Sequence, residues 1–187
     1  MAVVAVLTPI ALLLSYKTVP QVKSEVDDIL YYGNQYVENA DHYYESLYYP
    51  YSGTQTRLIM WRLSAEQISE KPLGVGTGDV DDALEVKMSE KGLHQEFIDQ
   101  HFNPHNQYLQ ILIEVGIVGF LLIMIFFTKV LIKSWKEKDY LLLILLANCV
   151  MNCLFESMFQ RQSGMMFYTI LFCYLLIPKA EKLIDEH

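Results

Sequence analysis

The sequence predicts an all-α, multi-pass helical membrane protein with one large loop between its first and second spans. Hydrophobic residues make up 52% of the 187 residues, and they concentrate in an N-terminal block and in three blocks after residue 107. A polar region of about ninety residues separates the first block from the others. This distribution favours membrane helices on both sides of a large polar loop over a single soluble domain.

We expect three parts along the chain. Residues 1–16 are a mostly apolar run, shorter than the roughly 20 residues that cross the hydrocarbon core of a bilayer. The run lacks the basic start of a secretory signal, so we interpret it as a truncated transmembrane helix. Residues 17–107 should form the loop, and residues 108–187 should contain three further transmembrane helices.

The loop carries the net charge of the protein. Residues 17–104 contain 15 Asp or Glu and 7 Lys or Arg, which gives the same −8 as the whole chain. We therefore expect no nucleic acid partner, because nucleic acid requires a basic surface. Cys149, Cys153 and Cys173 all lie in the apolar blocks, so they predict neither a disulfide framework nor a metal site.

Three helices are predicted in the loop. An amphipathic helix should run from Ser24, a good N-cap, to Tyr49. Thr54 should cap a second helix that ends near Glu70. A short charged helix should follow over Asp79–Lys91.

The second loop helix and the turn after it contain candidate binding residues. Arg57 and Trp61 are four residues apart and therefore share one helix face, whereas Arg62 lies on another face. Considered alone, either arginine is best explained by a surface ion pair with Glu66 or another acid. Lys71–Gly78 is rich in glycine and should form a tight turn. No strand precedes it, so it is not a dinucleotide-binding loop.

The first helix after the loop is predicted to begin at an Asn-Pro-His sequence. Asn103 is a good N-cap and Pro104 suits the first helical position, which places His105 in the first turn. A helix N-terminus attracts anions, so the sequence places a base next to an anion site. At about 100° per residue, Gly116 and Gly119 share the face of His105 and would let a neighbouring helix approach closely. A histidine that only caps the helix is the alternative interpretation.

Three histidines in this region have a spacing that suggests zinc. His94, His101 and His105 are seven and four residues apart. Asn103-Pro104 prevents one continuous helix from presenting the last two together. We therefore expect no metal site, and we interpret His94 and His101 as loop residues.

Three apolar segments follow, over Tyr108–Thr128, Tyr140–Phe159 and Ser163–Ile177. The first and the third are followed by lysines, which indicate cytoplasmic loops because basic residues are retained on that side of a membrane. This orientation makes the large helical loop periplasmic and places His105 on the same side. The lysines are Lys129, Lys133, Lys136, Lys138, Lys179 and Lys182.

The second of these segments carries polar residues that lipid would not tolerate. Asn148, Asn152 and Glu156 recur at intervals of four, so they form one polar stripe on a helix. Such a stripe must face protein or water. Glu156 and Arg161 should flank a short outer turn before the last span.

The segment around His105 matches a known motif. His105-Asn106, nine intervening residues and Gly116-x-x-Gly119 resemble the pattern His-[Asn/Ser/Gln]-x9-Gly-x-x-Gly of the O-antigen ligase family of bacterial envelope glycosyltransferases. Upstream, Arg57-x-x-x-Trp61 and the glycine-rich turn resemble the segment that precedes the histidine in that family. Members have many more spans, so the chain resembles a C-terminal portion of one.

The resemblance implies a glycosyltransferase of the bacterial inner membrane that needs neither a metal nor a cofactor. It would transfer a glycan from a polyprenyl-diphosphate carrier to an acceptor hydroxyl at the periplasmic face. His105 would be the catalytic base, and Arg57, whose guanidinium fork matches two phosphate oxygens, would stabilise the departing diphosphate. The remaining candidates are Trp61, Arg62 and Asn106 for substrate binding, and Gly116 and Gly119 for the structure of the motif.

The resemblance leaves the acceptor open. The implied partners are a polyprenyl-diphosphate-linked glycan, membrane lipids, and lipid A-core or another saccharide or protein acceptor. An O-antigen or exopolysaccharide polymerase and a protein O-oligosaccharyltransferase share the same motif. A non-catalytic membrane interaction or transport protein is the alternative of another class, because the fragment would lack a complete site without the upstream spans.

Overall fold

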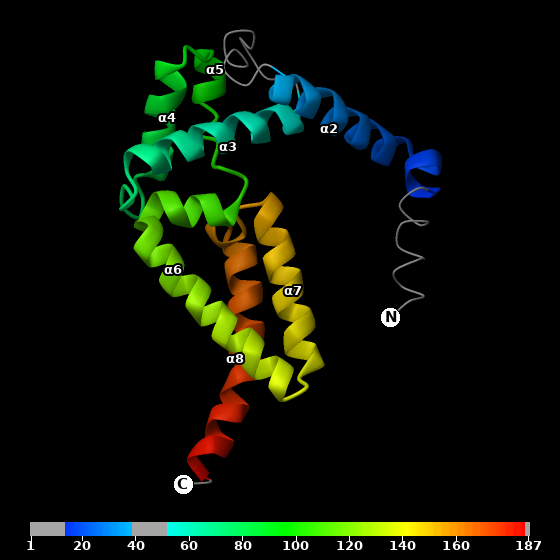
Figure 1. Ribbon diagram of the computed structural model, residues 1–187, viewed down its shortest axis with the longest axis vertical. Helices are drawn as coiled ribbons and strands as arrows, with labels where there is room; N and C mark the ends of the chain where they lie inside the picture. Colours follow the sequence, from blue (N-terminus) through cyan, green and yellow to red (C-terminus); the bar gives the residue numbers. More distant parts are fainter. Residues whose placement is uncertain (1–13, 39–51, 186–187) are drawn as a thin grey trace.

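The computed structural model describes residues 14–38 and 52–185, and these residues form helices without any strand (Figure 1). The predicted all-helical class is therefore confirmed for the part of the chain that is described. The elements are α2 (Pro20–Glu38), α3 (Gly53–Glu70), α4 (Val80–Glu90), α5 (Gln95–Ile98), α6 (Gln107–Lys136), α7 (Tyr140–Phe155), the 3-10 helix η1 (Met158–Gln160) and α8 (Gln162–Asp185).

The first loop helix begins earlier than predicted. α2 starts at Pro20 rather than after Ser24. Proline is tolerated in a first turn because its missing N–H would be unpaired there anyway, so the helix extends back by one turn. α2 ends at Glu38, and the rest of the helix predicted to Tyr49 lies outside the described residues, as does most of the predicted N-terminal span.

The second loop helix ends where predicted but is capped by another residue. The side chain of Ser52, not Thr54, accepts a hydrogen bond from the N–H of Gln55, and α3 runs from Gly53 to Glu70. Ser52 has the extended backbone of an N-cap. The short charged helix predicted over Asp79–Lys91 is α4.

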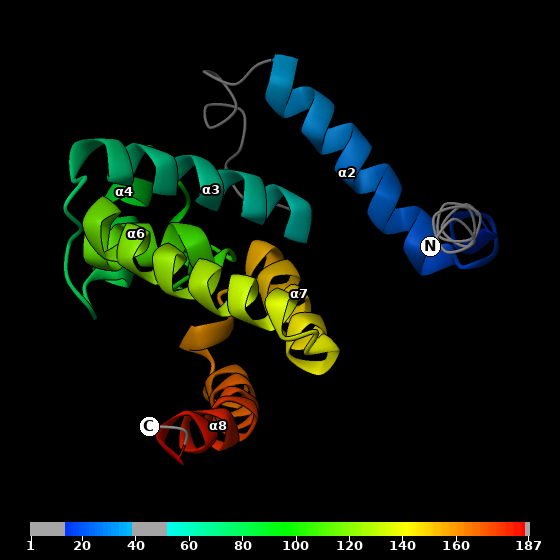
Figure 2. The same ribbon diagram turned by 60° about the horizontal axis from the view of Figure 1, so that its bottom comes forward.

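The helices α3, α4 and α5 pack with the first part of α6 around one hydrophobic core, and we call this unit the outer layer (Figures 1 and 2). Ile113 of α6 belongs to this core, so the loop folds directly onto the beginning of α6. The core residues are Ile59, Met60, Leu63, Val80, Leu84, Met88, Leu93, Phe97, Ile98 and Ile113.

The rest of α6, with α7 and α8, forms a second unit that we call the membrane half, after the location that the sequence predicts for it. α6 packs on α7 and α7 packs on α8, around a small core of Leu145, Cys149, Cys153 and Tyr168. Large apolar side chains also cover the outside, as at Leu122 (64% exposed). A surface of this kind is unusual in water and normal in lipid. Among the described residues, α6 is long and apolar enough to cross a membrane, whereas α7 and Gln162–Leu176 are apolar but shorter.

Candidate active site

His105 lies just before α6 rather than in its first turn, which corrects the predicted helix start. Asn106 is the N-cap, and its Oδ1 accepts hydrogen bonds from the N–H groups of Tyr108 (2.9 Å) and Leu109 (3.1 Å). Asn103 instead closes a local turn, because its Oδ1 accepts a hydrogen bond from the N–H of His105 (2.9 Å). The sequence contains two asparagines that can cap the helix, Asn103 and Asn106, and Asn106 is the N-cap of α6.

His105 also has an uncommon backbone conformation, with φ at +48°. A residue other than glycine in this region costs free energy, and such residues cluster at functional sites. The predicted alignment of His105 with Gly116 and Gly119 on one helix face does not hold. His105 is outside the helix, and Gly116 interrupts it.

The imidazole of His105 is paired with Glu156 at the end of α7. Its Nδ1 lies 3.3 Å from Oε1 of Glu156, and the two side chains are 20% and 22% exposed. Nη2 of Arg161 lies 3.3 Å from the same carboxylate oxygen. When Nδ1 carries the proton and donates to the carboxylate, the lone pair of Nε2 remains available to accept a proton.

Glu156 was not among the residues predicted for the site. The sequence placed it in a polar stripe with Asn148 and Asn152 and next to a short outer turn. The turn is present as η1, but Glu156 adopts an extended backbone after the helix and turns away to His105. The available signal was an ionisable residue in an otherwise apolar segment, which is by itself a reason to expect function.

The residues after His105 bind the same end of α7 through their side chains. Nδ2 of Asn106 donates to the carbonyl of Leu154 (3.0 Å), one of the carbonyls that a helix C-terminus leaves unpaired. The hydroxyl of Tyr108 donates to the carbonyl of Val150 (3.1 Å). Both polar groups of the Asn106 side chain are therefore used within the protein, and they hold His105 next to Glu156.

The outer turn is fixed to the first part of α6 by a second set of hydrogen bonds. Oε1 of Gln107 accepts from the N–H of Phe159 (2.7 Å). Oε1 of Glu114 accepts from the side-chain amides of Gln110 and Gln160. Gln107 and Gln110 are buried. The segment that carries Glu156 is thus bonded to the residues after His105 both before Glu156, at Leu154, and after it, at Phe159 and Gln160.

The structure distinguishes the two candidate arginines on α3. Nε of Arg62 lies 3.0 Å from Oε1 of Glu66, one turn along the helix, which is the surface ion pair that the sequence suggested for either arginine. Nε of Arg57 and Nε1 of Trp61 are buried atoms with no hydrogen-bond partner within the described part of the chain. A buried N–H without an acceptor costs about 1–3 kcal/mol, so a ligand oxygen there would be stabilising.

Arg57 and Trp61 belong to the same unit as His105, although they do not touch it through polar groups. No hydrogen bond or ion pair between described residues joins either of them to the histidine. α3 packs alongside the first part of α6, which starts directly after His105 (Figures 1 and 2). Arg57 is therefore carried by α3, and His105 lies directly before the helix that packs alongside α3.

The glycine motif forms a joint between the glycine-rich turn and α6. Gly116 has φ 66° and ψ −174°, so α6 bends there, and Figure 1 shows the helix changing direction below α3. The turn supplies partners for the backbone groups around the bend. Val75 donates to the carbonyl of Ile113 (2.8 Å), Gly76 donates to that of Glu114 (3.0 Å), and Ile117 donates to that of Pro72 (2.9 Å).

Glycine is required on both sides of this joint. A Cβ on Gly116 would lie 2.3 Å from the carbonyl carbon of Leu73, and a Cβ on Gly74 would lie 2.6 Å from the carbonyl oxygen of Glu114. A Cβ on Gly119 would meet the side chain of Val115 across the bend at 2.5 Å. The close approach expected at Gly116 is present, but its partner is the loop and not a neighbouring helix.

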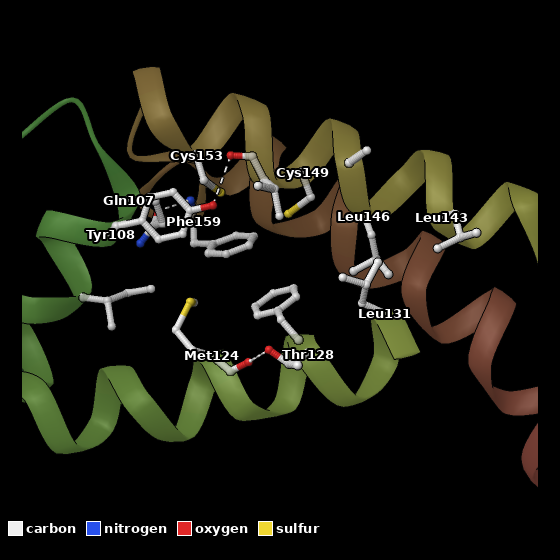
Figure 3. A pocket seen from close by; sticks show the side chains of 14 residues that line it. Gln107, Tyr108, Met124, Thr128, Leu131, Leu143, Leu146, Cys149, Cys153 and Phe159 are labelled. Atoms are coloured by element: carbon white, nitrogen blue, oxygen red, sulfur yellow. Dashed lines mark hydrogen bonds between the residues drawn. The ribbon is translucent and has the colours of Figure 1, made fainter. Parts of the chain in front are cut away.

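An apolar cavity of about 410 Å³ lies between α6 and α7. Figure 3 shows Met124 and Thr128 of α6 on one side and Cys149 and Leu146 of α7 on the other. Tyr108 and Gln107 lie at one end. These two residues follow His105-Asn106 directly in the sequence, so one end of the cavity is lined by close sequence neighbours of the histidine.

The other histidines are placed in the outer layer. His94 is the N-cap of α5, and its Nδ1 accepts from the N–H of Glu96 (3.3 Å). His101 is paired with Glu85 through Nδ1 at 2.5 Å, and this hydrogen bond to a carboxylate raises the pKa of His101. The described residues contain no group of three or more His, Cys, Asp or Glu side chains that could hold a metal ion.

Comparison with known proteins supports one family. No curated protein and no solved structure matches the chain. The family described as O-Antigen ligase matches residues 1–124 of the 187, a region that includes α3, the glycine-rich turn, His105 and the bend in α6. The chain belongs to the O-antigen ligase family.

Proposed function

We propose that this chain carries the catalytic base of a glycosyltransferase. The enzyme would move a glycan from a polyprenyl-diphosphate carrier to an acceptor hydroxyl at the periplasmic face of the bacterial inner membrane. Family membership supports the class of reaction. The observation that carries the proposal is the pairing of His105 with Glu156 where the loop meets α6.

In this mechanism Nε2 of His105 accepts the proton of the acceptor hydroxyl. The acceptor oxygen forms its bond to the anomeric carbon of the glycan, and the bond from that carbon to the phosphate oxygen breaks. The diphosphate leaves with the electron pair. Glu156 holds Nδ1 and stabilises the imidazolium that forms, a base role worth roughly 10²–10⁴ in rate.

The departing diphosphate would be bound by α3. Arg57 keeps its charge in any environment and offers a planar fork of donors, and its Nε has no partner among the described residues. The indole N–H of Trp61, one helical turn away, also has no hydrogen-bond partner among the described residues. Arg62 is less suited to bind the diphosphate because its guanidinium is already paired with the carboxylate of Glu66. Asn106 would act by positioning His105, since its own amide is already bonded.

The apolar cavity between α6 and α7 would hold part of the hydrocarbon chain of the carrier. It is lined mainly by Leu, Ile, Phe, Met and Cys side chains, and it begins beside the residues that follow His105. A hydrocarbon gains free energy when it enters such a lining. The charged diphosphate would remain in the outer layer above it.

This mechanism requires the orientation predicted from the sequence, with the large loop on the periplasmic side of the membrane. Residues 1–16 would be a transmembrane helix, residues 17–107 the periplasmic loop, and residues 108–187 three further spans. From Ile117 to Lys136 the helix rises about 30 Å, the thickness of a hydrocarbon core. A phosphatase fusion near Glu90 should be active and one near Lys136 silent; the opposite pattern would contradict the proposal.

The test of the base is a transfer assay on the full-length protein. His105→Ala should lower glycan transfer by about 10²-fold or more, with donor binding and membrane insertion retained. Glu156→Gln should lower it by about 10-fold to 100-fold, because a charged hydrogen bond to the base is lost. His94→Ala is the matched control and should transfer at nearly the normal rate.

Two outcomes would separate His105 from this role. Near-normal transfer by His105→Ala would leave the histidine without a catalytic part. Loss of donor binding in step with transfer would make it a phosphate contact.

Lipid A-core, repeat-unit and protein acceptors offered in parallel would distinguish a ligase from a polymerase and from a protein O-oligosaccharyltransferase. Transfer should persist with EDTA present, since arginine would supply the positive charge.

A further inference from the structure

The end of α6 farthest from His105 carries a basic patch that the proposed transfer reaction does not use. Lys129, Lys133 and Lys136 are spaced by four and three residues, so they lie on one face of the helix. With Ile132 and Glu137 they line a cavity of about 280 Å³. We name these five residues the lysine patch.

The charges of the lysine patch are only partly neutralised. Nζ of Lys133 lies 3.9 Å from Oε1 of Glu137, a long contact between side chains that are each 41% exposed. Lys129 and Lys136 have no hydrogen bond or ion pair to another described residue. The patch therefore has an excess of positive charge around a hollow large enough for a small anionic group.

The position of the patch identifies the kind of anion. The lysines follow the apolar part of a helix that is long enough to cross a membrane, and Trp135, 74% exposed, lies among them. Lysine and tryptophan at this depth face lipid headgroups, and long lysine side chains extend toward them. Ile132 adds an apolar contact for the glycerol and upper acyl region of a lipid.

We propose that the lysine patch binds the headgroup of an anionic glycerophospholipid. Its phosphodiester would lie between Lys129 and Lys136, and Ile132 and Trp135 would contact the apolar part of the same lipid. Each lysine near an anionic membrane surface contributes a factor of about five in affinity. The inference needs α6 to cross the membrane, but it does not depend on the transfer reaction.

The experiment compares lipid binding by the full-length protein in detergent, with native mass spectrometry as the readout. Phosphatidylglycerol should bind more tightly than phosphatidylcholine of the same acyl chains. Lys129→Gln with Lys136→Gln should weaken phosphatidylglycerol binding by about 25-fold. Lys129→Arg with Lys136→Arg should retain it, because charge is kept. Lys23→Gln with Lys71→Gln, which removes the same charge from exposed loop positions, is the matched control.

Several results would overturn the proposal. Equal binding of the two lipids by the wild-type protein would show that the headgroup is not recognised. Unchanged phosphatidylglycerol binding by the glutamine pair would place the lipid elsewhere. Displacement of the lipid by millimolar inorganic phosphate would make the patch a free-phosphate site. If the glutamine pair fails to fold, weak binding by the folded arginine pair would also contradict the proposal. Failure of these tests would leave transfer by His105 untouched.

Discussion

The outer layer and the membrane half use different interactions to hold their helices together. The outer layer encloses a core of ten buried apolar residues and ties its helices with ion pairs, as when Lys87 bridges α4 to Glu70 of α3 at 2.6 Å. The membrane half buries four residues in its core and joins α7 to α8 through neutral groups. There the hydroxyl of Tyr168 donates to Oδ1 of Asn148 (2.8 Å).

This difference matches the requirements of two kinds of surroundings. Charged pairs are tolerated where water solvates their outer side, as around Lys87 and Glu70, whereas isolated charges are costly within lipid. The contact between His105 and Glu156 lies at the boundary between the two units, and the glycine joint at Gly116 connects them. The site depends on the way in which one unit is fixed to the other.

The largest effect is expected from a substitution that breaks the joint between the two units. Gly116→Ala would place a Cβ 2.3 Å from the backbone of Leu73, at a φ,ψ pair that glycine alone adopts readily. We expect a loss of more than about 4 kcal/mol in the free energy of unfolding and little transfer activity. Thermal unfolding of the full-length protein in detergent and a transfer assay would measure both.

Gly92→Ala is the matched control for that substitution. Gly92 also has positive φ, at +71°, but a Cβ there would meet nothing within 4 Å. Only the backbone strain of about 1–2 kcal/mol should remain. Similar destabilisation by the two variants would show that the contact with Leu73 is not what holds the units together.

Substitutions of the two arginines on α3 should have smaller and unequal effects on the rate of glycan transfer. Arg57→Lys keeps the charge but loses the planar fork, so we expect about 10-fold slower transfer with normal folding. Arg62→Lys should be milder, because the ion pair with Glu66 contributes at most about 1 kcal/mol at the surface. Donor-dependent transfer rates would give the comparison. Arg57→Ala at the wild-type rate would remove this residue from the site.

The smallest effect concerns pH, and it should be confined to the outer layer. The hydrogen bond to Glu85, with the nearby carboxylates Asp81 and Asp99, raises the pKa of His101 above 6.5. The pairing therefore stabilises the outer layer fully below pH 6.5, and this stability is lost as the pH rises through the higher pKa of the folded state. His101 is largely exposed, so the change in Tm should be small.

His101→Gln should remove the pH dependence of Tm that arises from this pair. Glu85→Gln should do the same, because it removes the carboxylate that His101 binds. Thermal unfolding measured between about pH 6 and pH 9 would show it. Transfer at constant pH should change little in either variant. A pH dependence of Tm that survives both substitutions would assign the titration to another group.

The sequence by itself determined the helical class, the division into a polar loop and apolar segments, and the motif. These follow from local properties, because apolar runs, caps and helix-breaking residues act over a few neighbours along the chain. The ends of α3 and α4 were predictable for that reason. The start of α6 was not, since Asn103 and Asn106 are both good caps, and contacts with the end of α7 decide between them.

The tertiary structure alone decided which residues meet at the site. Glu156 is 51 residues from His105 along the chain, and no periodicity connects two residues at that separation. Pro72 and Ile117 are brought together only when the glycine-rich turn packs on α6. Arg62 pairs with Glu66 one turn along its own helix, which is a local contact, whereas only tertiary packing buries Nε of Arg57 without a partner among the described residues.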